Sequence, residues 1–129
     1  MRVHHVGIVT EQIEKSRRIY ESLGYKACSD ITLDYQQHNK LLFMESSDLS
    51  QRIELIESID DDSTVRNFKP GYHHIGYEVA EPMEVFVKRF HRLRIGKIFS
   101  PPIQAPALEN RLIRFAFLTT MELIEFIFS

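Results

Sequence analysis

The sequence is poor in the residues that mark several protein classes, and each shortage excludes one class. Its 129 residues include no tryptophan and one cysteine, Cys28, so no intramolecular disulfide can form and a disulfide-rich scaffold is excluded. Glycine and proline number five each, too few for a collagen-like or low-complexity chain. No apolar run approaches the roughly 20 residues that span a bilayer, so we expect no membrane partner.

The chain also lacks an excess of charge of either sign. Sixteen basic and 18 acidic residues are interspersed and give a net charge of −2, so no basic face is expected and nucleic acid is excluded as a partner. The opening residues, MRVHHVG, contain no long apolar segment of the kind found in signal peptides. Together with the single cysteine, these features predict a cytoplasmic protein.

The chain does contain a repeated phrase. HHVGIVT occupies residues 4–10, and HHIGYEV occupies residues 73–79. A second pair of similar strings follows later in each half, RIELIE at residues 52–57 and MELIEF at residues 121–126. Internal similarity of this kind indicates a duplicated structural unit.

The predicted order of elements is the same in both halves: one strand, one helix and three strands. Apolar residues at helical spacing predict a helix over residues 11–23, capped by Thr10 and ended by Gly24. A second helix is predicted between Pro82 and Gly96. The expected buried stripes are Ile13, Ser16, Ile19, Tyr20 and Leu23 in the first helix and Met83, Phe86, Val87, Phe90 and Leu93 in the second. The sequence therefore predicts an α+β domain of two tandem βαβββ modules, 1–57 and 72–129, joined by a polar linker, 58–71.

Strand periodicity distinguishes the two histidines of each pair. Successive side chains of a strand point to opposite faces. His4 and His73 share their faces with apolar residues and are expected to pack under the helix of their module. His5 and His74 share theirs with glycines, which leave space above the sheet, so these two histidines are the better candidates for a functional site.

A glutamate on the last strand of each module is the second candidate. Glu54 follows His5 by 49 positions, and Glu122 follows His74 by 48. Each strand carries a second carboxylate on its opposite face, Glu57 or Glu125. Matched spacing favours Glu54 and Glu122 but fits the other pair equally well, so periodicity alone leaves the choice open.

These phrases together resemble the vicinal oxygen chelate superfamily, also called the glyoxalase/bleomycin-resistance/dioxygenase fold. Within it, the chain is most similar to methylmalonyl-CoA epimerases and to small bacterial lactoylglutathione lyase-like proteins. The resemblance implies two modules whose sheets enclose a cleft, and a homodimer. It also implies one divalent metal ion (Zn, Ni, Co, Mn or Fe) held by His5, Glu54, His74 and Glu122.

The function implied by the resemblance is metal-dependent isomerisation, epimerisation or lyase chemistry. A proton next to a metal-bound carbonyl would be removed, with Glu122 as the base. The expected substrate is a small carbonyl acid, thioester or hemithioacetal. Two alternatives stay open: a metal-free small-molecule binding protein similar to drug-sequestering members of the fold, and a non-haem iron dioxygenase.

Two further positions bear on the chemistry. Methylmalonyl-CoA epimerases carry a second acid/base glutamate where this chain has Gln36 or Gln37, which cannot exchange protons at neutral pH. Asp34 or His38 could replace that group. Arg111 either binds a substrate carboxylate or phosphate or is a turn residue.

Overall fold

A computed structural model describes residues 1–129 and contains two helices and ten strands. In chain order the elements are β1 (Arg2–Val9), α1 (Ile13–Ser22), β2 (Tyr25–Ala27), β3 (Thr32–Asp34), β4 (Asn39–Ser46), β5 (Arg52–Ser58), β6 (Gly71–Val79), α2 (Met83–Leu93), β7 (Gly96–Ile98), β8 (Ile103–Ala105), the 3-10 turn η1 (Pro106–Leu108), β9 (Arg111–Leu118) and β10 (Leu123–Phe128). The predicted α+β class is confirmed. Neither helix has the length and apolar character needed to cross a membrane.

The chain forms two compact units. The first unit comprises His5–His73, and the second comprises Met1–His4 with His74–Ser129. The boundaries therefore fall inside β1 and β6, whereas the sequence predicted a boundary in the polar segment 58–71. Each unit contains most of one predicted module.

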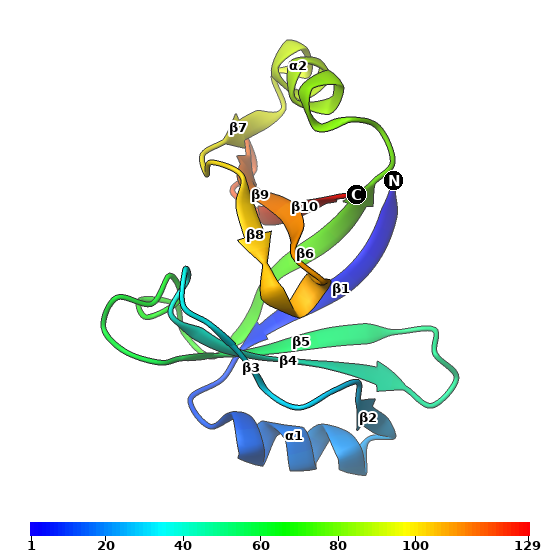
Figure 1. Ribbon diagram of the computed structural model, residues 1–129, viewed down its shortest axis with the longest axis vertical. Helices are drawn as coiled ribbons and strands as arrows, with labels where there is room; N and C mark the ends of the chain where they lie inside the picture. Colours follow the sequence, from blue (N-terminus) through cyan, green and yellow to red (C-terminus); the bar gives the residue numbers. More distant parts are fainter. The chain divides into compact units, whose positions relative to one another are not determined.

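In the first unit, β5 lies between β1 and β4, parallel to β1 and antiparallel to β4. The short strands β2 and β3 both pair with β4. Helix α1 covers one face of β4 and β5 (Figure 1). The buried residues between helix and sheet are Ile13, Leu42, Met44, Ile53 and Leu55. Their alternation along β4 and β5 leaves the other face of the sheet for different side chains.

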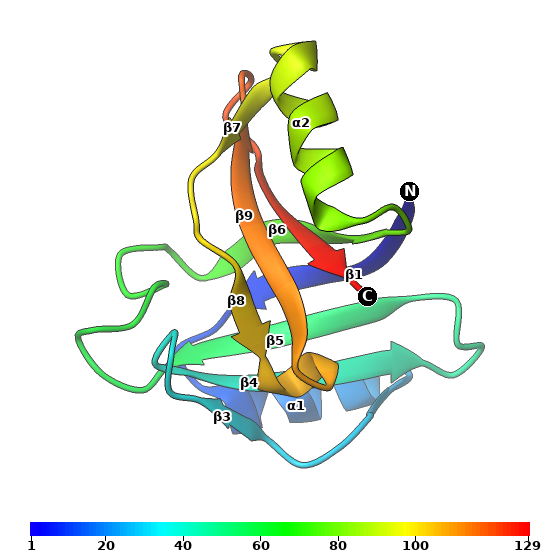
Figure 2. The same ribbon diagram turned by 45° about the horizontal axis from the view of Figure 1, so that its top comes forward.

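The second unit repeats this arrangement. Strand β10 is parallel to β6 and antiparallel to β9, and β9 pairs with β7 and β8. Helix α2 lies along one face of β6, β9 and β10 (Figure 2). The buried residues on that face are Val79, Phe86, Phe90, Ile98, Ala116, Ile124, Phe126 and Phe128. Four phenylalanines make this core more aromatic than that of the first unit.

The second strand of each module is split into two short pieces. The sequence predicted three strands after each helix, but the first unit has four, because β2 and β3 are separate strands with a bend between them. In the second unit Pro101 and Pro102 separate β7 from β8. Proline cannot donate a ladder hydrogen bond, which explains the second break.

The helix ends differ from the predictions. Ile13 is buried and Tyr20 packs against the core, but Ile19 and Leu23 are exposed, so the expected stripe of α1 is only partly correct. Leu23 lies just beyond the last residue of the helix, Ser22. Leu93 of α2 is also exposed.

Gly96 does not end α2 as predicted. The helix ends at Leu93, and Arg94 takes the left-handed conformation, φ 53°, at its C-cap. Gly96 instead begins β7, where a Cβ atom would lie 2.4 Å from the backbone oxygen of Phe117. Close contact between β7 and β9 is therefore the reason for glycine at this position.

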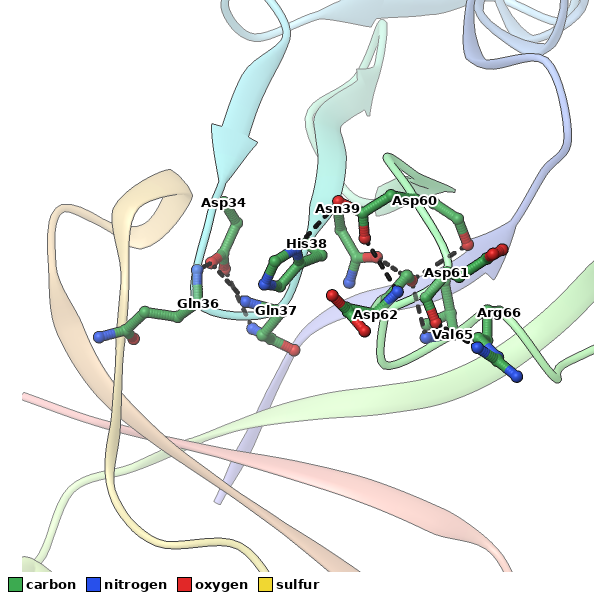
Figure 3. Close-up of polar contacts among 12 residues, drawn as sticks. Asp34, Gln36, Gln37, His38, Asn39, Asp60, Asp61, Asp62, Val65 and Arg66 are labelled. Carbon is green, nitrogen blue, oxygen red and sulfur yellow. Dashed lines mark hydrogen bonds and ion pairs between the residues drawn. The ribbon is translucent and has the colours of Figure 1, made fainter.

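The polar segment 58–71, predicted to be a linker, is fixed to the first unit. The Ser63 hydroxyl lies 2.5 Å from Asn39 Oδ1 and 3.0 Å from the backbone nitrogen of Val65, which donates to it. Asn39 Nδ2 also donates to the Thr64 hydroxyl at 3.0 Å. Figure 3 shows Asn39 and Val65 in this region. Because Ser63 and Val65 are buried, the segment is part of the packed structure and not a loose tether.

Candidate metal and proton-transfer site

Four residues form a row across the sheet of the first unit, on the face opposite α1. They belong to β1, β5, β4 and the end of β2. Gly7 of β1 is paired with Glu54 of β5, and Glu54 is paired with Phe43 of β4. The backbone nitrogen of Cys28 donates to the carbonyl of Phe43 at 2.9 Å, which extends the row to the end of β2. We call Gly7, Glu54, Phe43 and Cys28 the first row.

The second unit has an equivalent row on the face opposite α2. Gly76 of β6 is paired with Glu125 of β10, and Glu125 is paired with Phe115 of β9. The backbone nitrogen of Phe99 donates to the carbonyl of Phe115 at 3.0 Å. We call Gly76, Glu125, Phe115 and Phe99 the second row. The two rows have the same order, glycine, glutamate, phenylalanine, so the duplication extends to individual side chains.

A buried histidine lies beside the glutamate of each row. His5 Nε2 lies 3.4 Å from Glu54 Oε1, and His74 Nε2 lies 4.0 Å from Glu125 Oε1. All four residues are at most 5% exposed. Each unit therefore presents one imidazole and one carboxylate away from water.

The phenylalanine of each row orients the histidine ring. The ring centroids of His5 and Phe43 are 5.0 Å apart at 74°, and those of His74 and Phe115 are 5.9 Å apart at 90°. Both are edge-to-face contacts, which are the favoured geometry for aromatic pairs. Sequence reasoning missed both phenylalanines. Their positions, Phe43 and Phe115, recur at nearly the same spacing as the two histidines, and this was the available signal.

Glu122 is not beside His74, contrary to the expectation from the sequence. It lies in the exposed turn before β10, where it accepts a hydrogen bond from the Thr120 hydroxyl that lowers the pKa of its carboxyl group. Glu125 occupies the position beside His74. Because the two glutamates are three residues apart, they belong to opposite faces of a strand, and only Glu125 shares the face of His74.

The misassignment came from aligning the string ELIE, which occurs in both halves. When the two modules are compared by strand pairing, Ile53–Ile56 (IELI) of β5 is equivalent to Ile124–Ile127 (IEFI) of β10. The signal in the sequence was the apolar run LIEFIF, which contains a single charged residue, Glu125. In the structure every residue of this run is buried. A lone carboxylate inside such a run is the one that needs a specific environment.

Glu57, the second carboxylate of its strand, has a structural role. Its Oε1 accepts a hydrogen bond of 2.7 Å from the backbone nitrogen of Ile13, the first residue of α1. Its other oxygen lies 3.3 Å from Lys40 Nζ. The expected cap, Thr10, accepts from the backbone nitrogen of Gln12 instead. Glu57 therefore satisfies one of the donors that a helix leaves unpaired at its start.

The residues considered as a second acid/base are already engaged in the β3–β4 turn. Asp34 is fully buried, and its Oδ1 accepts hydrogen bonds of 3.0 Å from the backbone nitrogens of Gln36 and Gln37 (Figure 3). Its Oδ2 accepts from Gln37 Nε2 at 3.1 Å. His38 Nδ1 lies 3.2 Å from Asp60 Oδ2. These contacts stabilise the turn and leave Asp34 and His38 poorly suited to accept a proton from substrate.

Arg111 forms an ion pair within the second unit. Its Nη1 donates to Glu78 Oε2 at 3.0 Å, and Arg2 Nη2 lies 3.6 Å from the other oxygen of the same carboxylate. Partial burial raises the pKa of Glu78, but the bond from Arg111 and the nearby cations outweigh it, so the pKa is lowered. These residues line a pocket of about 480 Å³. Arg111 is thus half-buried and held by Glu78, and its guanidinium is already partly neutralised.

His73 packs against Phe68 of the segment 58–71, whereas the sequence predicted a position under the helix of its module. Its ring contacts Phe68 edge-to-face, with centroids 4.5 Å apart. Burial lowers the pKa of His73 to about 4, so the ring is neutral at pH 7. A neutral, half-buried ring against phenylalanine fits a packing role.

The donor set fits a divalent cation. Two imidazoles and two carboxylates are the ligands found around Zn, Fe and Ni, with Mn also suited to the carboxylates. A buried carboxylate that keeps its charge needs a compensating cation. His5 with Glu54 and His74 with Glu125 are the residues that could hold one.

Comparison with known proteins places the chain in a family. The profile of the Glyoxalase/Bleomycin resistance protein/Dioxygenase superfamily matches residues 4–111. No curated protein sequence gives a significant match. Among solved structures, a hypothetical protein from Bacillus halodurans C-125 is 20% identical, with a TM-score of 0.85 over 99% of this chain and 94% of that chain.

Two similar structures are methylmalonyl-CoA epimerases. The enzyme from Mycobacterium tuberculosis is 18% identical, with a TM-score of 0.82 over 99% of this chain and 87% of that chain. A variant of the Streptomyces coelicolor enzyme, in complex with 2-nitronate-propionyl-CoA, is 16% identical, with a TM-score of 0.80 over 100% of this chain and 97% of that chain. At these identities the likeness shows a shared fold. The chain belongs to the Glyoxalase/Bleomycin resistance protein/Dioxygenase superfamily.

Proposed function

We propose that the chain is a metal-dependent isomerase, epimerase or lyase that removes a proton from the carbon next to a carbonyl group. His5, Glu54, His74 and Glu125 would hold one divalent cation. The observation that supports this proposal is the buried histidine–glutamate pair at the same position of both modules. Glu125 replaces Glu122, the residue expected from the sequence, in the ligand set.

A divalent cation at these residues supplies positive charge that stabilises the oxyanion formed when a carbon next to a carbonyl loses its proton. The chain's own residues keep the site ordered and dry. Edge-to-face contacts with Phe43 and Phe115 hold the two imidazole rings in fixed orientations. Burial of all four polar side chains excludes water, which strengthens electrostatic interactions with a charged intermediate.

Glu125 is the proposed proton acceptor. It is a buried carboxylate whose Oε1 lies 4.0 Å from His74 Nε2, so it lies beside one of the proposed cation ligands. The proton would go to a carboxylate oxygen of Glu125. Because Asp34 and His38 are engaged in the β3–β4 turn, we favour proton transfer by one base over two-base epimerisation.

The proposed substrates are small carbonyl acids, thioesters and hemithioacetals. The Streptomyces coelicolor epimerase variant carries 2-nitronate-propionyl-CoA, which supports a thioester as one member of this group. Methylmalonyl-CoA and the hemithioacetal of methylglyoxal with glutathione are the two probes that separate epimerase from lyase chemistry.

The test is the metal content of protein purified without a chelator or a histidine tag, measured by elemental analysis. We expect near-stoichiometric Zn, Ni, Co, Mn or Fe in the wild type, and loss of most of it in His74→Ala and Glu125→Ala. Glu122→Ala is the matched control, and it should keep its metal because Glu122 lies in an exposed turn. Equal loss in Glu122→Ala and Glu125→Ala would overturn the assignment of Glu125.

Solvent deuterium exchange next to the carbonyl of the two probes tests the chemistry. Glu125→Gln should lower the exchange rate by about 100-fold or more, since general base catalysis contributes about that factor. Iron together with oxygen consumption would point to a dioxygenase instead. Absence of metal, even after soaking, would overturn the proposal and favour a metal-free binding protein.

A further inference from the structure

The second unit has an opening between α2 and the sheet, on the face opposite His74 and Glu125. This opening, which we call the α2 groove, has a volume of about 190 Å³. Its lining is apolar apart from Arg89 and the Tyr77 hydroxyl, and all the lining residues belong to the second unit. The α2 groove is therefore separate from the candidate metal site.

At the corresponding positions of the first unit, a tyrosine ring fills the space. Tyr20 and Phe90 are both the eighth residue of their helix, and the residue five positions later is Tyr25 in the first unit and Ile95 in the second. The Tyr25 ring contacts Tyr20 edge-to-face, with centroids 5.6 Å apart, and packs against the core. Ile95 offers no ring, and it lines the groove instead.

Positive charge gathers beside the α2 groove, although the net charge of the whole chain is −2. Residues 88–97 contain five basic side chains and no acidic one, and all five are exposed: Lys88, Arg89, Arg92, Arg94 and Lys97. Arg89 lines the groove, and its guanidinium carbon lies 5.3 Å from the centre of the Phe86 ring. Glu81 accepts a hydrogen bond from Arg89 and neutralises one of these charges, so a net positive charge remains.

We propose that the α2 groove binds a small molecule with an apolar chain and an anionic group at one end. A dry cavity of about 150 Å³ can hold one benzene molecule, whereas drug-sized ligands occupy about 300 Å³ or more. A groove of about 190 Å³ lies between these sizes. The chain that fits has about six to eight carbon atoms, and the neighbouring cations select the anionic end.

The shape of the groove favours a free molecule over the surface of an anionic membrane. Phe86, Phe90 and Phe126 form its floor and are buried, whereas Leu93 and Ile95 at its sides are 52% and 44% exposed. A floor of this kind is covered by a chain that enters the groove. A bilayer instead takes up apolar side chains that protrude from an amphipathic helix.

The probes are butyrate, hexanoate, octanoate and octylamine, titrated into chelator-treated protein with labelled methyl groups and followed by NMR. Affinity should rise about tenfold from butyrate to hexanoate, since each buried CH₂ group contributes about fourfold. Octylamine has the same chain length as octanoate with a positive end, and it should bind about two- to fivefold more weakly. Shift changes should centre on the methyl groups of Leu93, Leu118 and Ile124.

Ile95→Tyr tests the position of the ligand, because it introduces the ring that fills the first unit. Octanoate affinity should fall at least tenfold. Ile19→Tyr is the matched control, since Ile19 is an exposed isoleucine of α1, and it should leave the affinity unchanged. Arg89→Met keeps an apolar side chain without the charge and should reduce the preference for octanoate over octylamine. Circular dichroism establishes that each variant is folded.

The outcomes distinguish this proposal from the proposed function. Octanoate binding to metal-free protein, lost in Ile95→Tyr, would support the α2 groove whether or not the chain is a metalloenzyme. Binding that requires added metal would place the carboxylate at the metal site and overturn the groove. Equal affinities for butyrate and octanoate, unchanged affinity in Ile95→Tyr, or binding to phosphatidylglycerol vesicles without binding to octanoate would each overturn it as well.

Discussion

Gly96 begins β7, where a Cβ atom would lie 2.4 Å from the Phe117 oxygen and 3.0 Å from Leu118 Cα. Both atoms belong to the backbone of β9, so Gly96→Ala can be accommodated only by moving β7 away from it. We expect a loss of about 2–3 kcal/mol in the free energy of unfolding, as for an overpacked core site. Urea denaturation measures this loss.

Gly24→Ala is the matched comparison for Gly96→Ala. Gly24 has a φ of 96°, but a Cβ there would meet nothing within 4 Å, so its cost is conformational and about 1 kcal/mol. A loss in Gly96→Ala no larger than that in Gly24→Ala would contradict the close contact between β7 and β9.

Single residues also show where sequence reasoning succeeded. Strand alternation placed His5 and His74 on a different face from His4 and His73, and His5 and His74 are the buried histidines next to a carboxylate. This was possible because strand alternation is a local property. Its place in the repeat made Glu54 a candidate, but alternation did not separate it from Glu57, and the resemblance to the family did.

At the scale of elements, α1 depends on a side chain from β5. Glu57→Ala removes the acceptor of the Ile13 backbone nitrogen, and we expect a loss of about 1–2 kcal/mol in unfolding free energy, the range for a lost helix cap. Amide hydrogen exchange should increase in the first turn of α1. Glu57→Gln keeps an acceptor oxygen and should cost less.

Lys40→Ala is the control that separates the cap from the ion pair. It removes the 3.3 Å contact with Glu57 and leaves the bond to Ile13 in place, so its cost should be below about 1 kcal/mol. Equal losses in Lys40→Ala and Glu57→Ala would mean that the ion pair, and not the cap, stabilises this end of the helix.

The element pattern was largely predictable, and its errors have physical causes. Helical spacing predicted both helices, but Ile19 and Leu23, which belong to the predicted buried stripe, are exposed. The segment 58–71 was predicted to be a linker because it is polar. Its polar groups instead bond to Asn39 and the turn beside it, and composition does not reveal such partners.

At the scale of the whole molecule, we expect a homodimer, with a mass by light scattering of twice the 15.2 kDa of one chain. The outermost strands of the two units, β2 and β7, are only three residues long, which limits association by strand pairing. Ile19 of α1 and Leu23, which directly follows the helix, are exposed apolar residues and a more suitable contact surface.

Leu23→Glu tests this contact, because a charge there would weaken an apolar interface and shift the mass toward the monomer. Leu49→Glu changes an equally exposed leucine in the β4–β5 turn and should leave the mass unchanged. A wild-type protein that is monomeric at all concentrations would contradict the dimer.

The sequence by itself determined the duplicated βαβββ pattern and the two buried histidines, because spacing and alternation are properties of the chain's local geometry. The choice of Glu54 over Glu57 came from the resemblance to the family. Only the tertiary structure decided that Glu125, and not Glu122, lies beside His74, and that Glu57 caps α1. Both depend on strand register, which is set by pairing between residues far apart in the chain. A register error of three residues moves a side chain to the opposite face of the sheet, so a carboxylate beside a histidine and one in an exposed turn can be told apart only after the strands are paired.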